Sequence, residues 1–274
     1  MTKKIALVTG ASAGMGKDFA RALLDEGMIV YAAARRLEQM QDLAELGAIT
    51  VKMDITKEED IQTLVQQINK DHGAVDVLIN NAGFGLYGAV EDVDINDARY
   101  QFEVNLFGLA RLTQALLPAM REQGSGTIIN ISSMGGKVYA PFGAWYHATK
   151  HALEGWSDCL RLELKDFGIN VVIIEPGAIK TEFAEVVAES LYKNSGQGAY
   201  AGLLDTFVKA FKKEYGKGGG GSEPKLITDL ILKALRSKQP KTRYLAGKYA
   251  KQLVFIRKWF GDRLYDQLVM SIIK

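Results

Sequence analysis

Four side chains have the types and the spacing that proton transfer to an oxygen atom requires. Tyr146 and Lys150 are four residues apart, so on a helix the ammonium group shares a face with the phenol. A free tyrosine has a pKa of about 10, and a neighbouring cation favours its phenolate form. Ser133 supplies a hydroxyl that can hold the reacting oxygen, and Asn105 lies 28 residues before Ser133. Together these groups could exchange a proton with an alcohol or a carbonyl oxygen.

The Tyr-x-x-x-Lys spacing also occurs at Tyr244 and Lys248, so the spacing alone does not identify the reactive pair. Ser133 follows a predicted central strand at residues 128–132 and precedes Tyr146 by 13 positions. Tyr244 has no such companions. We therefore assign the chemistry to Tyr146 and Lys150, and we expect Tyr244 at the edge of the sheet.

A glycine-rich turn joins the first predicted strand, residues 5–9, to the first predicted helix, residues 15–26. It reads Thr9-Gly10-Ala11-Ser12-Ala13-Gly14-Met15-Gly16. Glycines let the backbone turn tightly and let a phosphate approach the N–H groups at the helix N-terminus. The position of the turn favours a dinucleotide site over an ordinary strand-to-helix connection.

The end of the second predicted strand, residues 28–34, indicates which dinucleotide binds. NAD-binding folds place an acidic residue about 20 positions after the glycine turn, where it binds the ribose 2′-hydroxyl. Here the strand ends in Ala34-Arg35-Arg36, and no acidic residue occurs between Glu26 and Glu38. Because a guanidinium is a good partner for a 2′-phosphate, we predict NADP(H). The alternative is that both arginines are solvated residues at the start of the next helix.

The pattern T-G-x-x-x-G-x-G resembles the short-chain dehydrogenase/reductase superfamily, and further family motifs follow in order over residues 3–183. Asn80-Asn81-Ala82-Gly83 resembles the N-N-A-G segment, and Pro176-Gly177 with Thr181 resembles the P-G-x-x-x-T segment at the nicotinamide. The resemblance implies a catalytic tetrad of Asn105, Ser133, Tyr146 and Lys150. It also implies that Lys150 binds the nicotinamide ribose, that Asn105 holds a water in a proton relay, and that Asp54 contacts the adenine. The implied cofactor contacts are Gly10, Ser12, Ala13, Gly14, Met15, Gly16, Arg35, Arg36, Asp54, Ile55, Asn81, Ala82, Gly83, Tyr146, Lys150, Pro176, Gly177, Ile179 and Thr181.

The resemblance is strongest to members similar to 17β-hydroxysteroid and retinol dehydrogenases. It implies an NADP-dependent oxidoreductase that transfers a hydride between nicotinamide and a carbonyl/alcohol pair. The expected substrate is a lipophilic ketone, an aldehyde, or a steroid- or retinoid-like molecule, and the expected assembly is a homodimer or homotetramer. Two alternatives stay open: a non-catalytic dinucleotide-binding sensor, and a lipid dehydrogenase associated with a membrane surface.

Short β-branched runs alternate with longer amphipathic segments, which is typical of βαβ units. With the resemblance, this predicts an α/β fold: a Rossmann-type doubly wound parallel sheet of seven strands in the order 3-2-1-4-5-6-7. Helices are expected on both faces, followed by a C-terminal helical extension. Thr56 and Glu59 fit a capping box that would open one of these helices. The remaining strands are predicted at residues 50–53, 75–80, 127–131, 170–175 and 242–245, and the other helices at 37–46, 56–71, 97–122, 144–167, 223–237 and 248–273.

The 274 residues, 47% of them hydrophobic, fit one folded domain, 1–274. Cys159 is the only cysteine, so an intramolecular disulfide and a cysteine-based zinc cluster are excluded, and we expect a buried thiol. His147 and His151 lack ligand-like companions, so no metal is expected. The sequence shows neither a membrane-spanning run nor a signal segment, which predicts a cytoplasmic protein.

Residues 182–222 are predicted to form a substrate lid, because they are glycine-rich and carry scattered apolar side chains. The run Gly218–Ser222 also resembles an engineered linker, but nothing else marks a fusion, and we favour a native mobile loop. Aromatic side chains near the tetrad are expected to line an apolar pocket rather than only to pack. They are Phe84, Tyr87, Tyr139, Phe142 and Trp145.

Residues 248–274 form the predicted C-terminal extension. From Arg236 to Lys258 there are eight basic residues and no acidic one, whereas the rest of the chain has no basic excess. No nucleic-acid partner is therefore expected. We favour a helix that packs its apolar stripe on the domain and leaves its charges in water. The alternative is a segment that lies on an anionic membrane.

Overall fold

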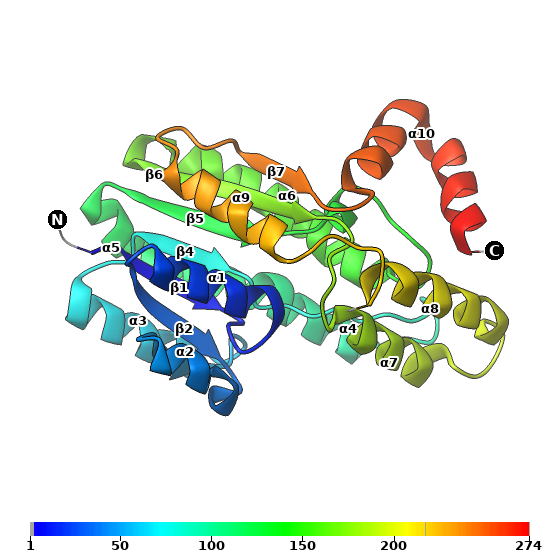
Figure 1. Cartoon of the computed structure of the whole chain (residues 1–274), viewed down its shortest axis with the longest axis horizontal. Coiled ribbons are helices and arrows are strands. Elements are labelled where there is room, and N and C mark those ends of the chain that lie inside the picture. The colour runs from blue at the N-terminus through cyan, green and yellow to red at the C-terminus, as the bar shows by residue number, and fades with distance from the viewer. Residues whose placement is uncertain (1–2, 217, 274) are drawn as a thin grey trace.

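The computed structural model describes residues 3–216 and 218–273, which form an α/β fold around one parallel sheet (Figure 1). The seven strands lie in the order β3-β2-β1-β4-β5-β6-β7, as predicted, and all paired neighbours are parallel. Residues 1–2, residue 217 of the predicted lid and residue 274 of the predicted extension lie outside the described residues. The strands are β1 (Ile5–Thr9), β2 (Ile29–Ala34), β3 (Ile49–Lys52), β4 (Val77–Asn80), β5 (Gly126–Ile131), β6 (Ile169–Pro176) and β7 (Arg243–Ala246).

Helices cover both faces of the sheet, and each face has its own hydrophobic core. On one face lie α1 (Gly14–Asp25), α2 (Gln41–Glu45) and α9 (Lys225–Arg236). On the other lie α3 (Glu58–His72), α5 (Leu109–Gln123) and α6 (Ala144–Glu163). The other helical elements are α4 (Ile95–Phe102), a π-helical segment (Glu103–Gly108), 3₁₀ turns at Leu37–Met40, Met134–Gly136 and Lys165–Phe167, α7 (Phe183–Ser195), α8 (Ala201–Tyr215) and α10 (Ala250–Ile273).

Most residues of the central strands are apolar, because helices cover both faces of the sheet. All five residues of β1 are buried, as are residues 171–176 of β6. Asn80 and Asn130 are an exception, since they are fully buried polar residues placed opposite each other in β4 and β5. The Asn80 side-chain amide donates to Asn130 (2.9 Å), and the Asn130 amide donates to Ser157 of α6 (2.8 Å). These bonds fix α6, which carries Tyr146 and Lys150, against the centre of the sheet.

The start of α3 differs from the prediction. The helix begins at Glu58, and its N-cap residue Lys57 makes no side-chain capping bond. The Thr56 hydroxyl instead donates to the Asp54 carboxylate (2.8 Å) in the preceding turn. The predicted capping box of Thr56 and Glu59 is therefore wrong, because a short polar side chain can bond within a turn as readily as to a helix.

Two smaller predictions also fail. The helix expected over residues 37–46 is split into a 3₁₀ turn and the short α2. Cys159, expected to be buried, is exposed. The reason is helical geometry: Leu153, Ser157 and Leu160 form the buried side of α6, and Cys159 follows Ser157 by about 200° around the helix axis.

The segment predicted to be a glycine-rich mobile loop is mostly helical. It forms α7 and α8, which pack against each other beyond the carboxyl ends of the strands (Figure 1). The two helices bury Val187, Leu191, Leu204 and Phe207 in one shared cluster. The glycine run after α8 is held by backbone hydrogen bonds, among them Ser222 N to Ala178 O (2.9 Å). The helical spacing of the apolar residues therefore determines the structure of this segment more than its glycine content does.

The C-terminal extension, α10, is a helix, as predicted. It is bent at Gly261, whose φ of 76° interrupts the helical backbone. Among the described residues, no helix combines the length and the apolar character that crossing a membrane would require. The favoured prediction holds only in part: Leu253 and Val254 pack on the domain, whereas Phe255, Trp259, Phe260 and Leu264 are exposed.

Candidate active site

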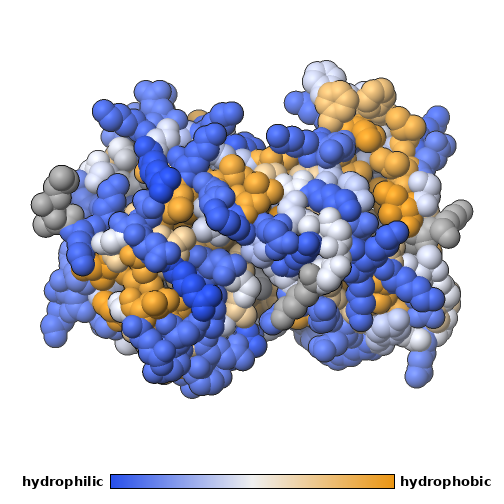
Figure 2. Space-filling view, in the orientation of Figure 1, coloured by the Kyte–Doolittle hydropathy of each residue, from blue (hydrophilic) through white to orange (hydrophobic). Residues whose placement is uncertain are grey.

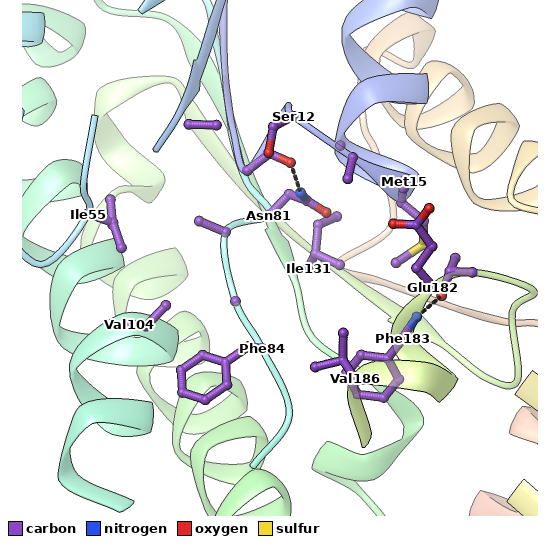
Figure 3. A pocket seen from close by; sticks show the side chains of 18 of the residues that line it. Ser12, Met15, Ile55, Asn81, Phe84, Val104, Ile131, Glu182, Phe183 and Val186 are labelled. Carbon is purple, nitrogen blue, oxygen red and sulfur yellow. Dashed lines mark hydrogen bonds between the residues drawn. The ribbon is translucent and has the colours of Figure 1, made fainter. Parts of the chain in front are cut away.

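A cavity of about 390 Å³ opens at the carboxyl ends of the central strands (Figure 3). This volume is in the usual range of small-molecule sites. Every residue predicted to act in catalysis or cofactor binding lines it, except Asn105. In Figure 3, Ile55 and Val104 border one side of the opening and Met15 and Val186 the other. Residues far apart in the sequence thus meet in one place, although the contacts assigned to each remain predictions.

The glycine turn between β1 and α1 is shaped by close packing. Gly10 has a φ of 67°, in the left-handed region that favours glycine. A Cβ on Gly16 would lie 2.4 Å from the carbonyl oxygen of Gly10 and from the side-chain nitrogen of Asn81. Asn81 in turn donates to the carbonyl of Thr9 (3.0 Å), while the Thr9 hydroxyl accepts from the backbone N–H of Asn81 and Ala82. The turn and the N-N-A-G segment therefore form one rigid unit.

The N-terminus of α1 borders the cavity and is suited to an anion. Its N-cap residue, Ala13, offers no side-chain hydrogen bond, and the first turn contains no acidic residue. The first N–H groups of a helix lack intrahelical partners and carry the positive end of the helix dipole. A dinucleotide pyrophosphate would fit this position, because the backbone here supplies N–H donors that the N-cap side chain does not use.

Arg35 and Arg36 lie at the cavity rim after β2. Arg35 donates to the Tyr100 hydroxyl (3.2 Å), and Arg36 lies at the outer limit of a hydrogen bond to the Ser12 hydroxyl (3.4 Å). Neither guanidinium forms an ion pair with any described residue. Two cations therefore face the cavity without a carboxylate to neutralise them.

Tyr146 and Ser133 lie together at the inner part of the cavity. Burial raises the pKa of Tyr146 above its ordinary value, and a hydrogen bond from Ser133 opposes this shift. The Ser133 hydroxyl also accepts from the backbone N–H of Gly135 (3.0 Å), which fixes its position. Without bound cofactor the Tyr146 phenol is thus kept protonated, which suits a proton donor. The lowering of its pKa that was predicted from the nearby Lys150 stays a prediction.

Lys150 is almost fully buried one turn after Tyr146. Its ammonium donates to the carbonyl of Ile131 (2.9 Å) at the end of β5 and lies 5.9 Å from the centre of the Tyr146 ring. Burial lowers the pKa of Lys150 to about 8, and the carboxylate of Glu154 partly offsets the effect. The ammonium form still predominates at neutral pH and places a positive charge beside the phenol.

Asn105 lies in the π-helical segment behind the cavity wall and is buried. Its side-chain oxygen accepts from the N–H of Phe84 (3.0 Å), and its amide donates to the Phe84 carbonyl (2.9 Å) and the Thr149 hydroxyl (3.2 Å). These bonds hold the loop after β4 against α6. The role of Asn105 in a water relay stays a prediction.

The other predicted cofactor contacts lie along the same edge. Asp54 borders the cavity, but its carboxylate accepts from the backbone and hydroxyl of Thr56 (3.0 and 2.8 Å), so it shapes the turn after β3. The segment after β6, from Pro176 to Thr181, is held by backbone bonds, including Gly177 N to Ala246 O (2.7 Å). This anchoring gives the strand end a defined position next to the cavity.

Of the five aromatic residues predicted to line a pocket, only Phe84 borders this cavity. Tyr87 is buried and packs against the Tyr146 ring at 5.6 Å, while Phe142 packs on Phe207 of α8 at 5.4 Å. Tyr139 contacts α10 and Trp145 packs beside Phe84. For these four, plain packing is the observed role.

The cavity also contains residues that the sequence did not single out. Tyr100 of α4 receives the hydrogen bond from Arg35, and Tyr215 comes from the end of α8. No local motif marks either residue, since only the folded chain brings α4 and α8 to the strand ends. The others are Ala33, Met53, Val104, Ile131, Ser132, Glu182 and Val186.

His147 has a structural role in this region. It hydrogen-bonds the Gly135 carbonyl through Nδ1 (2.9 Å) and accepts from Ala140 N through Nε2 (3.1 Å). Burial lowers its pKa to about 4. The neutral ring thereby braces the loop between Ser133 and Tyr146. Within the described part of the chain, no group of three or more His, Cys, Asp or Glu side chains could hold a metal ion.

The chain is similar to known proteins in sequence and in fold. The family model of the short chain dehydrogenases matches residues 4–191. The chain is 34% identical to a 3-ketodihydrosphingosine reductase of Bacteroides thetaiotaomicron, over 96% of each protein. It is 35% identical to a short-chain dehydrogenase of Streptomyces avermitilis of known structure, with a TM-score of 0.83 and coverage of 98% and 96%.

Solved structures of similar fold contain either nicotinamide dinucleotide. A serine dehydrogenase complexed with NADP⁺ is 28% identical, with a TM-score of 0.74 and coverage of 88% and 92%. A Burkholderia phymatum enzyme in complex with NAD is 24% identical, with a TM-score of 0.79 and coverage of 93% of each chain. The chain therefore belongs to the short chain dehydrogenase family, as an oxidoreductase that uses a nicotinamide dinucleotide on alcohol or carbonyl substrates.

Proposed function

We propose that this protein is an NADP(H)-dependent oxidoreductase that interconverts a lipophilic carbonyl compound and its alcohol. The observation that supports the proposal is that Ser133, Tyr146 and Lys150 line the same cavity as Arg35 and Arg36, which form no ion pair with any described residue. The bound nicotinamide would supply or accept the hydride. The protein's own groups would hold the reacting oxygen and move its proton.

Each polar group has one task in this mechanism. Ser133, fixed by Gly135, would hydrogen-bond the substrate oxygen. Tyr146 would give its proton to that oxygen during reduction and take it back during oxidation. The Lys150 ammonium, held on the Ile131 carbonyl, would stabilise the phenolate that remains after the proton has left. Asn105 would act through position, because its bonds keep the loop after β4 against α6.

The test of the chemistry is Tyr146→Phe, with Tyr244→Phe as the matched control. NADPH oxidation would be followed with a panel of ketones, aldehydes, steroids and retinoids. Loss of the proton donor should lower kcat by a factor of about 10²–10⁴ and leave cofactor binding nearly unchanged. The control removes the same hydroxyl from β7, where it accepts only a weak bond from Lys241 N, and should retain activity. Near-normal kcat in Tyr146→Phe would refute the mechanism, and a wild type that binds cofactor without any turnover would favour the sensor alternative.

The preference for NADP(H) is supported by charge. A 2′-phosphate would meet two guanidiniums that no carboxylate neutralises, and Ala34 stands at the end of β2 without an acidic group to repel it. Charge-assisted hydrogen bonds contribute about 1.5–3 kcal/mol, which corresponds to roughly 10–100-fold in affinity. Calorimetric binding of NADP⁺ and NAD⁺ should show this difference, and Ala34→Asp with Arg35→Ala should reverse it. Equal affinities in the wild type would refute the assignment.

A lipophilic substrate is supported by the walls of the cavity near Tyr146. Phe84, Phe183 and Val186 line it (Figure 3), and Tyr215 at the end of α8 also borders it. The Phe183 ring lies 5.6 Å from the Tyr146 ring. We propose that residues 182–222, the predicted lid, cover this part of the cavity. Val186→Asp should therefore raise KM for apolar substrates more than it changes kcat.

A further inference from the structure

The outer tip of α10 is the most unusual surface of the molecule. In Figure 1 the helix projects beyond the layers that enclose the sheet, and its two halves meet in a bend. The bend is at Gly261, where the backbone has φ 76° and ψ −177°. We call residues 251–264 on both sides of it the α10 tip.

The inner side of α10 is firmly attached to the domain. Ala250 and Tyr265 are buried, and the Tyr265 hydroxyl donates to the carbonyl of Tyr139 (2.8 Å) while their rings meet edge to face at 5.0 Å. Leu253 and Val254 add apolar contacts to the same cluster. The helix is therefore held in a fixed position, and its outward side chains are not exposed through fraying.

The outward side of the tip carries large apolar side chains. Phe255, Trp259 and Phe260 are 54%, 66% and 58% exposed, and Leu264 is 46% exposed. The Phe255 ring lies 6.4 Å from that of Trp259 and 6.0 Å from that of Phe260, so the three form one patch. Figure 2 shows apolar surface over this projecting helix. A contiguous exposed patch of this kind marks an interaction site more often than scattered single residues do.

The charges around the patch indicate what it contacts. Lys251, Lys258 and Arg263 are exposed and form no ion pair with any described residue. The one acidic residue of the tip, Asp262, pairs with Arg257, while the Asp266 carboxylate, which accepts from the Tyr139 hydroxyl (2.8 Å), lies beyond the tip. Among the described residues, the unpaired charges of the tip itself are therefore all positive. Two copies of the tip would bring like charges together, whereas an anionic surface would complement them.

We propose that the α10 tip docks on the surface of an anionic lipid bilayer. The patch projects outward and is not a groove, so it can enter the interfacial region of a bilayer, where tryptophan is favoured. Apolar burial and attraction to anionic lipid then act together, which is the combination that stable peripheral binding requires. The Lys258 ammonium lies 5.3 Å from the Trp259 ring, so a cation and an inserted aromatic would reach the headgroups together.

The experiment is co-sedimentation of the full chain with vesicles of phosphatidylcholine, with and without phosphatidylglycerol. We expect binding to the anionic vesicles at low salt, weakened by added salt. Each cation near such a surface contributes about fivefold in affinity, so Lys251→Gln with Lys258→Gln and Arg263→Gln should bind about 100-fold more weakly. Trp259→Ala with Phe260→Ala should also lose binding. All five side chains are exposed, so these variants should fold.

A second readout follows the tip directly. Trp259 is more exposed than Trp145 and Trp156, so its emission should shift to the blue when anionic vesicles are added, and Trp259→Phe should abolish the shift. Leu162→Ala is the matched control, since Leu162 is an equally exposed apolar residue on α6, and it should bind like the wild type. Absence of vesicle binding by the folded protein at low salt would overturn the proposal. Self-association that depends on Trp259 and Phe260, without vesicle binding, would overturn it in favour of an interface between copies.

Discussion

A buried carboxyl behind Lys150 should make the stability of this protein fall as the pH rises through the weakly acidic range. Glu175, near the end of β6, and Glu154, on α6, have side chains only 4% and 5% exposed. Lys137 and Arg243 approach both carboxyls, and Arg243 also pairs with Asp158. One oxygen of each glutamate has no hydrogen-bond partner among the described residues. A proton shared between the two carboxyls would satisfy both oxygens.

The size of the effect follows from the pKa. Burial, the largest cause, and the neighbouring Glu154 raise the pKa of Glu175 from 4.5 to about 7, although the cations Lys137 and Arg243 oppose the shift. The folded protein thus binds this proton more tightly than the unfolded chain. Unfolding releases the proton between pH 4.5 and 7, so the free energy of unfolding decreases as the pH rises through this window, by at most about 3 kcal/mol. This is opposite in sign to the usual effect of a salt-bridged carboxylate.

Glu175→Gln isolates this contribution, because glutamine keeps the size of the side chain and can donate to Glu154 at every pH. Urea unfolding, followed by tryptophan fluorescence, should be measured for both proteins between pH 4.5 and 8. The variant should gain up to about 3 kcal/mol relative to the wild type over that range, or roughly 6–10 °C in melting temperature. Glu163→Gln, an exposed position on the same helix as Glu154, is the control and should differ from the wild type by less than about 0.5 kcal/mol at every pH. A pH-independent difference between Glu175→Gln and the wild type would refute the reasoning.

Three further predictions concern packing and exposure. Gly16→Ala should weaken dinucleotide binding, measured by calorimetry, because the new methyl group would lie 2.4 Å from Gly10 O and Asn81 Nδ2; Gly27→Ala, with a positive φ but open space around it, should lower stability without changing that affinity. Asn130→Ala should lower the free energy of unfolding by about 2–4 kcal/mol, since it leaves Asn80 and Ser157 without their shared partner and opens a cavity in the core; a loss below about 0.5 kcal/mol would contradict this account. Cys159 should react with a thiol reagent in the folded protein about as fast as in urea, because it is exposed; strong protection in the native state would show that the thiol is covered.

Local patterns in the sequence were sufficient to predict most of the strands, whereas the strand order and the place of the site were implied by the family resemblance. A continuous apolar run such as residues 171–174 predicts a strand that is covered on both faces, as a central strand of a parallel sheet is. Gly10 and Ser133 follow the carboxyl ends of β1 and β5, and Pro176 ends β6, so in this strand order all three lie at the same end of the parallel sheet. The place of each of these residues at the end of a strand thus determines where it lies in the fold.

The predictions that failed depended on tertiary contacts or on competing local signals. In residues 183–215 the apolar spacing of Val187, Leu191, Leu204 and Phe207 favours helices, but the glycine content was given more weight. Tyr215 could not be assigned to the site, because only the packing of α8 beside Tyr87 and Phe183 brings it there. For α10 the sequence showed an amphipathic segment, but neither the bend at Gly261 nor the exposure of Trp259 and Phe260 just before it.

The bonds at Ser222 have a consequence for how this protein could acquire a new substrate. The chain leaves the sheet at Ala178–Lys180 and returns at Ser222, where Ser222 N donates to Ala178 O (2.9 Å) and Lys180 N to Ser222 O (3.0 Å). The intervening excursion of α7 and α8 therefore begins and ends at one closed backbone junction beside the strand that borders the cavity. An insertion with such adjacent, fixed ends can be exchanged without altering the register of the sheet. Grafting the corresponding excursion of a relative between Thr181 and Ser222 should then change the substrates accepted while Thr181, Tyr146 and Lys150 are kept.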